Sequence, residues 1–208
     1  MMSDEPVGEV KPRARMSGAD RKQQLLDVAL ELFSRQGFER TTVRDIANAA
    51  DVTDGLIYRY FASKEELLDE VIDRARRRIA DVPIRFDTER NVTDVILDIL
   101  RGLARGMRAN LALIDLQWGE MSRGSIVGTH LTSIRDEVFS QLAALLAQYT
   151  EAGVLAVAEP ALGAKLLAGT MFSFTCVHRC DDDDAWQQGI AEWTRFVATT
   201  FVDGTRPR

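Results

Sequence analysis

The chain has 208 residues, 46% of them hydrophobic and 28% charged, which is typical of a globular protein long enough for two packed units. A formal net charge of −6 excludes a protein that coats nucleic acid through a broad basic surface. No uncharged apolar run of 18 residues and no signal peptide is present, and two cysteines suit a reducing compartment, so we expect a cytoplasmic protein that does not span a membrane.

Residues 1–19 have almost no apolar periodicity and contain two prolines and two glycines, so we expect a disordered arm. Basic residues gather in its second half and just after it. They either follow a DNA backbone or minor groove or belong to a solvated tail, and both interpretations stay open. The residues concerned are Lys11, Arg13, Arg15, Arg21 and Lys22.

Residues 20–80 contain several closely spaced helix starts. Asp20 followed by Gln23 predicts a capping box for a helix that Gly37 ends. Thr42 with Asp45 predicts a second helix start, and Asp51 stands where the chain must turn sharply. Further starts follow at Thr53 and at Ser63, the latter with Glu66 three residues on. This spacing predicts a helix-turn-helix followed by a long amphipathic helix.

The residue pattern of this region resembles the DNA-binding domain of the TetR (tetracycline repressor) family over roughly residues 20–79. The similarity is specific because it is long and depends on residue order. It rests on Thr42, Val43, Ile46 and Ala47, then Ala50, Val52, Thr53, Gly55, Ile57, Tyr58, Tyr60 and Phe61, then Ser63, Lys64, Glu65 and Leu67.

The resemblance implies that the helix from Thr53 is the recognition helix, with its first residues Thr53, Asp54, Gly55 and Leu56 toward base edges in the major groove. It also implies phosphate contacts, and hydroxyls and amines are suitable partners for phosphate. The implied phosphate partners are Thr42, Tyr58, Tyr60 and Lys64, with Arg44 and Arg59 as further DNA-binding candidates.

Other interpretations of these residues remain. Tyr58 and Tyr60 are also compatible with core aromatics whose hydroxyls reach water, and Lys64 with a solvated lysine at a helix start. Asp51 stands where the family commonly has glycine. Asp54 places a carboxylate near DNA, where it repels phosphate but accepts a hydrogen bond from cytosine, or it caps the helix.

Residues 81–208 read as helices throughout, so the fold class is all-α. The resemblance implies an N-terminal three-helix helix-turn-helix DNA-binding domain and a C-terminal helical ligand-binding and dimerisation domain. The resemblance implies that the last two long helices pair with those of a second subunit. Small residues there allow close approach, although packing within one chain explains them equally. The interface candidates are Ala161, Ala164, Ala168, Gly169, Trp193 and Val197.

The resemblance also implies an effector pocket in the C-terminal domain. Bulky or soft side chains there are candidates to wall it, and each is also compatible with plain core packing. They are Met107, Leu111, Trp118, Met121, Phe139, Met171, Phe172 and Phe174, with Gln117, Arg123, His130 and His178 as polar candidates.

Catalysis and metal binding find little support in the residues. No phosphate-binding glycine loop or nucleophile motif is present, and on a helix His178 points away from the face shared by Cys176 and Cys180. We therefore expect no enzyme, cofactor or metal. The resemblance implies a homodimer that binds a palindromic double-stranded operator and is released by a small apolar effector. The alternative is a ligand-binding or interaction dimer whose head does not read DNA.

Overall fold

The computed structural model describes residues 16–80, 82, 84–124 and 126–207. Most of the predicted arm, including Lys11, Arg13 and Arg15, lies outside them. The described part forms nine helices and no strand, which confirms the all-α prediction. The helices are α1 (Gly18–Gln36), α2 (Val43–Ala49), α3 (Asp54–Tyr60), α4 (Lys64–Ala80), α5 (Val92–Arg108), α6 (Leu111–Ser122), α7 (Ile126–Glu151), α8 (Pro160–Val177) and α9 (Asp183–Gly204).

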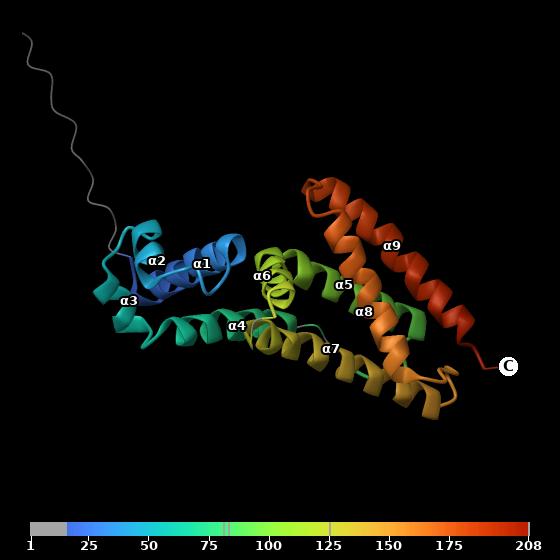
Figure 1. The fold of residues 1–208 in the computed structure, drawn as a ribbon. Helices are drawn as coiled ribbons and strands as arrows, with labels where there is room; N and C mark the ends of the chain where they lie inside the picture. The colour runs from blue at the N-terminus through green and yellow to red at the C-terminus, as the bar shows by residue number, and fades with distance from the viewer. Residues whose placement is uncertain (1–15, 81, 83, 125, 208) are drawn as a thin grey trace, which may run out of the picture.

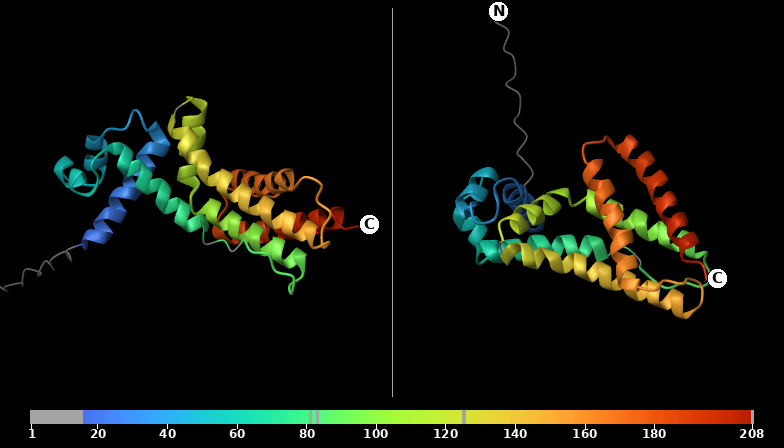
Figure 2. Two further views of the ribbon diagram at one scale, coloured as in Figure 1. Left: turned by 90° about the horizontal axis from the view of Figure 1, so that it is seen from below. Right: turned by 45° about the vertical axis from the view of Figure 1, so that its right-hand side comes forward.

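The molecule is elongated, with α1–α4 at one end and α5–α9 at the other (Figure 1). We call these two parts the head and the body. Helix α4 leads from the head toward the body, and α6 lies against α1. Helices α8 and α9 both pack on α5, and α7 packs on α8 and α6 (Figure 2). The head therefore meets the body mainly through α1, α4, α6 and α7.

The N-terminal hydrogen bonds of the helices show which of the predicted N-caps form. Thr42 and Asp45 form the predicted capping box at α2, and Glu66 N–H donates to Ser63 Oγ (3.1 Å) at α4. The first helix differs from the prediction: its N-cap is Ser17, whose hydroxyl accepts from Asp20 N–H (3.1 Å) and donates to Asp20 Oδ2 (2.7 Å). Asp20 thus occupies the third helical position, where its carboxylate also suits the helix dipole.

Two clusters of buried apolar side chains hold the fold together. One belongs to the body and includes Leu100, Leu146 and Met171. The other fills the head, but it also contains Leu113 and Leu116 of α6 and Ile134 of α7. The core of the head therefore includes three side chains from the region after residue 81, which the sequence assigns to the C-terminal domain.

Helix α8 is the most apolar long helix of the described part. By length and composition alone it is apolar enough to cross a membrane, a test that core helices of folded domains also pass. Here it packs against α5, α7 and α9, and Ala164, Leu167, Ala168 and Met171 are buried. Pro160 occupies its first turn, as predicted.

Candidate nucleic-acid interface and ligand cavity

The turn between α2 and α3 orients the candidate recognition helix. Asp51 has a φ of 54°, the left-handed conformation predicted for this position. Val52 N–H donates to Ala47 O (3.0 Å), which closes the corner over the fully buried Ala47. Ile57 (2% exposed) and Phe61 (1% exposed) then bury one face of α3 in the head. The other face of this helix consequently points to solvent.

The side chains on the solvent face of α3 make few contacts with the rest of the chain. Thr53 is the N-cap residue, yet its hydroxyl makes no capping hydrogen bond. A Cβ added at Gly55 would meet nothing within 4 Å, so packing within the chain does not require glycine there. Tyr58 is 55% exposed. Of the ten predicted DNA-binding residues, those classed as exposed are Thr42, Arg44, Thr53, Asp54, Gly55, Tyr58 and Arg59.

Tyr60 and Leu56 lie partly buried at the edge of this face. Tyr60 packs against the head core, and its hydroxyl lies near Gly18 at the start of α1. The Arg59 guanidinium lies 5.8 Å from the Tyr60 ring centroid, a cation–π arrangement.

Thr42 is engaged by its own helix start. Its hydroxyl accepts from Asp45 N–H (3.1 Å) and donates to Asp45 Oδ2 (2.7 Å), while its backbone N–H also donates to that carboxylate (2.8 Å). These hydrogen bonds lower the pKa of Asp45. Because the hydroxyl proton of Thr42 is already donated, a phosphate there would have to compete with Asp45 for it.

Lys64 has a structural role that the sequence did not indicate. Its Nζ donates to the carbonyls of Phe38 (2.9 Å) and Thr41 (3.0 Å) and lies 4.2 Å from the Phe38 ring centroid. These contacts tie α4 to the loop between α1 and α2. Two of its three N–H donors are used in this way, so at most one remains for a phosphate.

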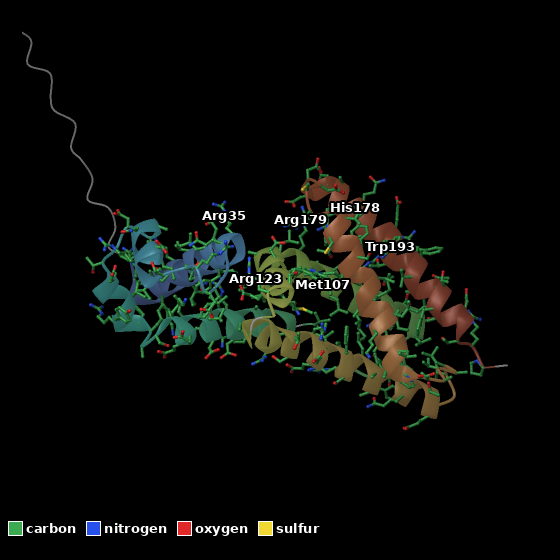
Figure 3. The ribbon with its side chains drawn as sticks, in the orientation of Figure 1. Arg35, Met107, Arg123, His178, Arg179 and Trp193 are labelled. Atoms are coloured by element: carbon green, nitrogen blue, oxygen red, sulfur yellow. The ribbon has the colours of Figure 1, made fainter. Side chains whose placement is uncertain are left out.

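The body contains a cavity of about 300 Å³ between α5, α6, α7 and α8. Met107, which Figure 3 labels near the middle of the body, lies on its wall. Five of the eight predicted wall residues line it: Met107, Trp118, Met121, Phe139 and Phe172.

The three other predicted wall residues lie elsewhere. Leu111 is outside the lining, Met171 is fully buried in the body core, and Phe174 stacks on His178 with ring centroids 4.3 Å apart. His178 Nδ1 also lies 2.8 Å from Asp181 Oδ2. Neither Phe174 nor His178 lines the cavity. Helical spacing alone did not indicate which apolar faces meet the cavity. The lining residues missed include Asn110, Leu113, Ile114, Ile134, Arg135 and Val138.

A buried carboxylate joins the head to the body and was missed in the sequence. Glu120 of α6 is 1% exposed, and its Oε1 accepts from Phe38 N–H (3.2 Å) and from Arg123 Nη1 (2.7 Å). Figure 3 shows Arg123 between α1 and α6. Gly37 lies against this pair with a φ of 88°, and a Cβ there would stand 2.9 Å from Arg123 Nη1. The signal was an acidic residue continuing the apolar spacing of Leu113 and Leu116.

The predicted interface residues fall into two groups. Ala164 and Ala168 are buried within the protomer, and Val197 packs against the body core, so all three are covered by their own chain. Ala161, Gly169 and Trp193 are exposed. Large apolar side chains are exposed beside them, namely Leu162 and Leu166 on α8 and Phe196 on α9.

Residues 25–71 match a family model described as bacterial regulatory proteins, tetR family. This part of the chain, which lies in the head, is thus similar to TetR-family regulators. The chain is 41% identical over 71 residues to the transcriptional regulator LuxR of Vibrio harveyi, and 48% identical over 52 residues to the transcriptional repressor KstR2 of Rhodococcus jostii. These alignments cover 34% and 25% of this chain and only 35% and 26% of the two relatives.

Solved structures extend the similarity to the whole TetR fold. A TetR-like regulator from Rhodococcus sp. RHA1 superposes with a TM-score of 0.64 at 24% identity, covering 90% of this chain and 96% of the other. The TetR-family regulator PfmR from Thermus thermophilus gives 0.67 at 20% identity, with 84% and 97% covered. The family-model match thus lies in the head, whereas the structural similarity extends over most of the chain.

Proposed function

We propose that this protein is a TetR-family transcriptional regulator that binds a palindromic operator as a homodimer and leaves it when a small apolar molecule occupies the cavity. The exposed face of α3 carries the proposal. A tight turn presents one face of this short helix to solvent. The exposed residues on it and at its N-cap are Thr53, Asp54, Gly55, Tyr58 and Arg59. Such a helix fits the major groove and offers hydroxyl, carboxylate and guanidinium groups to base edges and phosphates.

The proposed dimer uses the outer faces of α8 and α9. Leu162 (53% exposed), Leu166 (58%) and Phe196 (66%) make an apolar surface that a single protomer leaves uncovered. A second copy would bury it about a two-fold axis, because the same two helices are available on each subunit. Gly169 leaves open space on α8 that permits close approach of a partner helix.

The proposed release works through side chains that the head and the cavity share. Leu113 and Ile134 line the cavity, and both also belong to the core of the head. Arg76 of α4 adds a second connection by donating to Ser133 Oγ of α7 (3.0 Å). A molecule in the cavity would press on these residues and favour a body shape in which α4 and α1 hold the heads at another spacing.

The test is selection of double-stranded DNA from a random pool, followed by affinity measurements over a salt series. We expect an enriched inverted repeat whose affinity falls steeply between about 50 and about 200 mM salt, because phosphate contacts release counterions. The second candidate function, a ligand-binding dimer that does not read DNA, is favoured by the net charge of −6 and the exposed Asp54. Absence of any enriched sequence over random competitor would support that candidate instead.

A further inference from the structure

The size of the cavity bounds its ligand. A cavity of about 150 Å³ holds a benzene molecule, so one of about 300 Å³ holds a molecule roughly twice that size. A molecule of about ten to fifteen non-hydrogen atoms therefore fits. Trp118 (53% exposed) and Gly169 (exposed) both line the cavity, so it reaches the surface beside α6 and α8 and is accessible to such a molecule.

The lining is almost entirely aliphatic and aromatic. Polar side chains come only from Asn110, Gln117 and Arg135 among the described residues, and no Asp or Glu of this part lines the cavity. The Asn110 amide nitrogen already donates to Gly106 O (2.7 Å). A cation would thus be buried without a counter-charge, and a molecule with many hydroxyls would lack partners. The body of the ligand must be apolar.

Arg135 gives the cavity one charged group. Its side chain is 44% exposed, and its guanidinium lies 5.8 Å from the ring of Phe139, another lining residue. Nε and Nη2 donate to Asp136 Oδ1 (3.1 and 3.0 Å), and the two N–H donors of Nη1 have no hydrogen-bond partner among the described residues. An anionic group beside Arg135 would gain charge-assisted hydrogen bonds and remain partly hydrated, so it would avoid most of the cost of burying a charge.

We propose that the ligand of this cavity is an amphipathic monoanion, with its apolar body between α5, α6, α7 and α8 and its negative end at Arg135. This inference rests on the proposed function, since it assigns the chemical class of the effector. It also excludes one class, because cationic amphiphiles of the same size find no acidic partner on the described walls.

Three probes with the same ten-carbon chain test the charge: decanoate, decan-1-ol and decylammonium, titrated calorimetrically into the full-length protein below their micelle concentrations. We expect decanoate to bind about tenfold more tightly than decan-1-ol, and decylammonium to bind most weakly. Arg135→Gln should bring decanoate to the affinity of decan-1-ol without changing the latter. Arg105→Gln, an exposed arginine of α5 outside the lining, is the matched control and should change neither.

Several results would overturn the assignment: decan-1-ol binding as tightly as decanoate, Arg135→Gln weakening both equally, or no probe binding. A parallel measurement of operator affinity distinguishes failure of the proposed ligand class from failure of the proposed ligand-controlled DNA binding. If decanoate binds with the expected charge preference but operator affinity is unchanged, ligand release fails while the ligand class stands. If decan-1-ol and decanoate release the operator equally well, the ligand class fails while ligand release stands.

Discussion

The proposed DNA-facing surface of the head and the cavity of the body are built in opposite ways. The first comes from one short continuous segment, residues 42–59, whose exposed side chains make few contacts within the fold. The second is lined by Val82 and by residues of four helices, α5 to α8, and about half of its lining residues also pack in or against a core. One surface can therefore change its residues with little effect on folding, whereas the other cannot.

The difference has a mechanical consequence at α6. Leu113 of this helix lines the cavity and also packs in the head core, while Leu116 and Glu120 attach the same helix to α1. In the proposed function, a ligand would therefore contact residues that also hold head and body together. The exposed residues of α3, in contrast, would contact DNA through side chains that make few contacts within the fold.

The largest expected effect tests this shared core. Leu116 is 1% exposed between α6 and the head, so Leu116→Ala should lower the free energy of unfolding by about 2–5 kcal/mol. We also expect the single unfolding transition to separate into two, because head and body then lose their common side chains. Denaturant unfolding followed by circular dichroism measures both. Leu111→Ala, on the same helix but outside both buried clusters, is the control and should keep one transition.

A substitution in the proposed DNA-facing surface should have the opposite effect: it should change operator affinity and leave stability nearly unchanged. Gly55→Ala adds a methyl group where the chain leaves open space, so stability should stay constant or rise by up to about 1 kcal/mol through helix propensity. Operator affinity should fall about ten- to hundredfold, since the new group stands where base edges approach. Gly204→Ala, also in open space but in α9, should leave operator affinity unchanged. Unchanged affinity for the Gly55 variant would mean that α3 docks farther from the bases.

The same contrast explains what the sequence could predict. The head depends on contacts between residues three or four apart, so the capping box of Thr42, the left-handed Asp51 and the buried Ile57 could all be predicted. The N-cap of α1 could not be placed, because Ser17 and Asp20 both precede a suitable apolar stripe and only the structure shows which one begins the helix.

The cavity and the head–body contact depend on residues distant in sequence. Leu111, Met171 and Phe174 have the same apolar character as the residues that do line the cavity, and only the angles between helices separate them. The resemblance placed Lys64 at a phosphate, but its partners in the structure are the carbonyls of Phe38 and Thr41, which lie 26 and 23 positions earlier and are backbone groups. Such partners leave no signature in a residue pattern.

A smaller effect is expected at Tyr58. Its ring is 55% exposed and its hydroxyl has no partner among the described residues, so Tyr58→Phe should leave stability within about 0.5 kcal/mol of the parent protein. Affinity should fall about fivefold for operator and random DNA alike, because a phosphate contact carries no sequence information. Thr53→Ala is the comparison: its loss should depend on the base sequence of the site. A sequence-dependent loss for Tyr58→Phe would instead assign Tyr58 to base readout.

The smallest effect on stability is expected at Asp45, which caps α2 together with the predicted DNA-binding residue Thr42. Hydrogen bonds from Thr42 lower the pKa of Asp45 in the folded chain, so the ionised form stabilises the start of α2. That contribution is present above the pKa of the unfolded chain, near about 4, and is lost as pH falls through the lower pKa of the folded state. Asp45→Asn should therefore lower the melting temperature near neutral pH, and its difference from the parent protein should shrink as the pH falls through the lowered pKa of Asp45. A pH-independent loss in the Asp45 variant would mean that the geometry of the cap, and not its charge, stabilises α2.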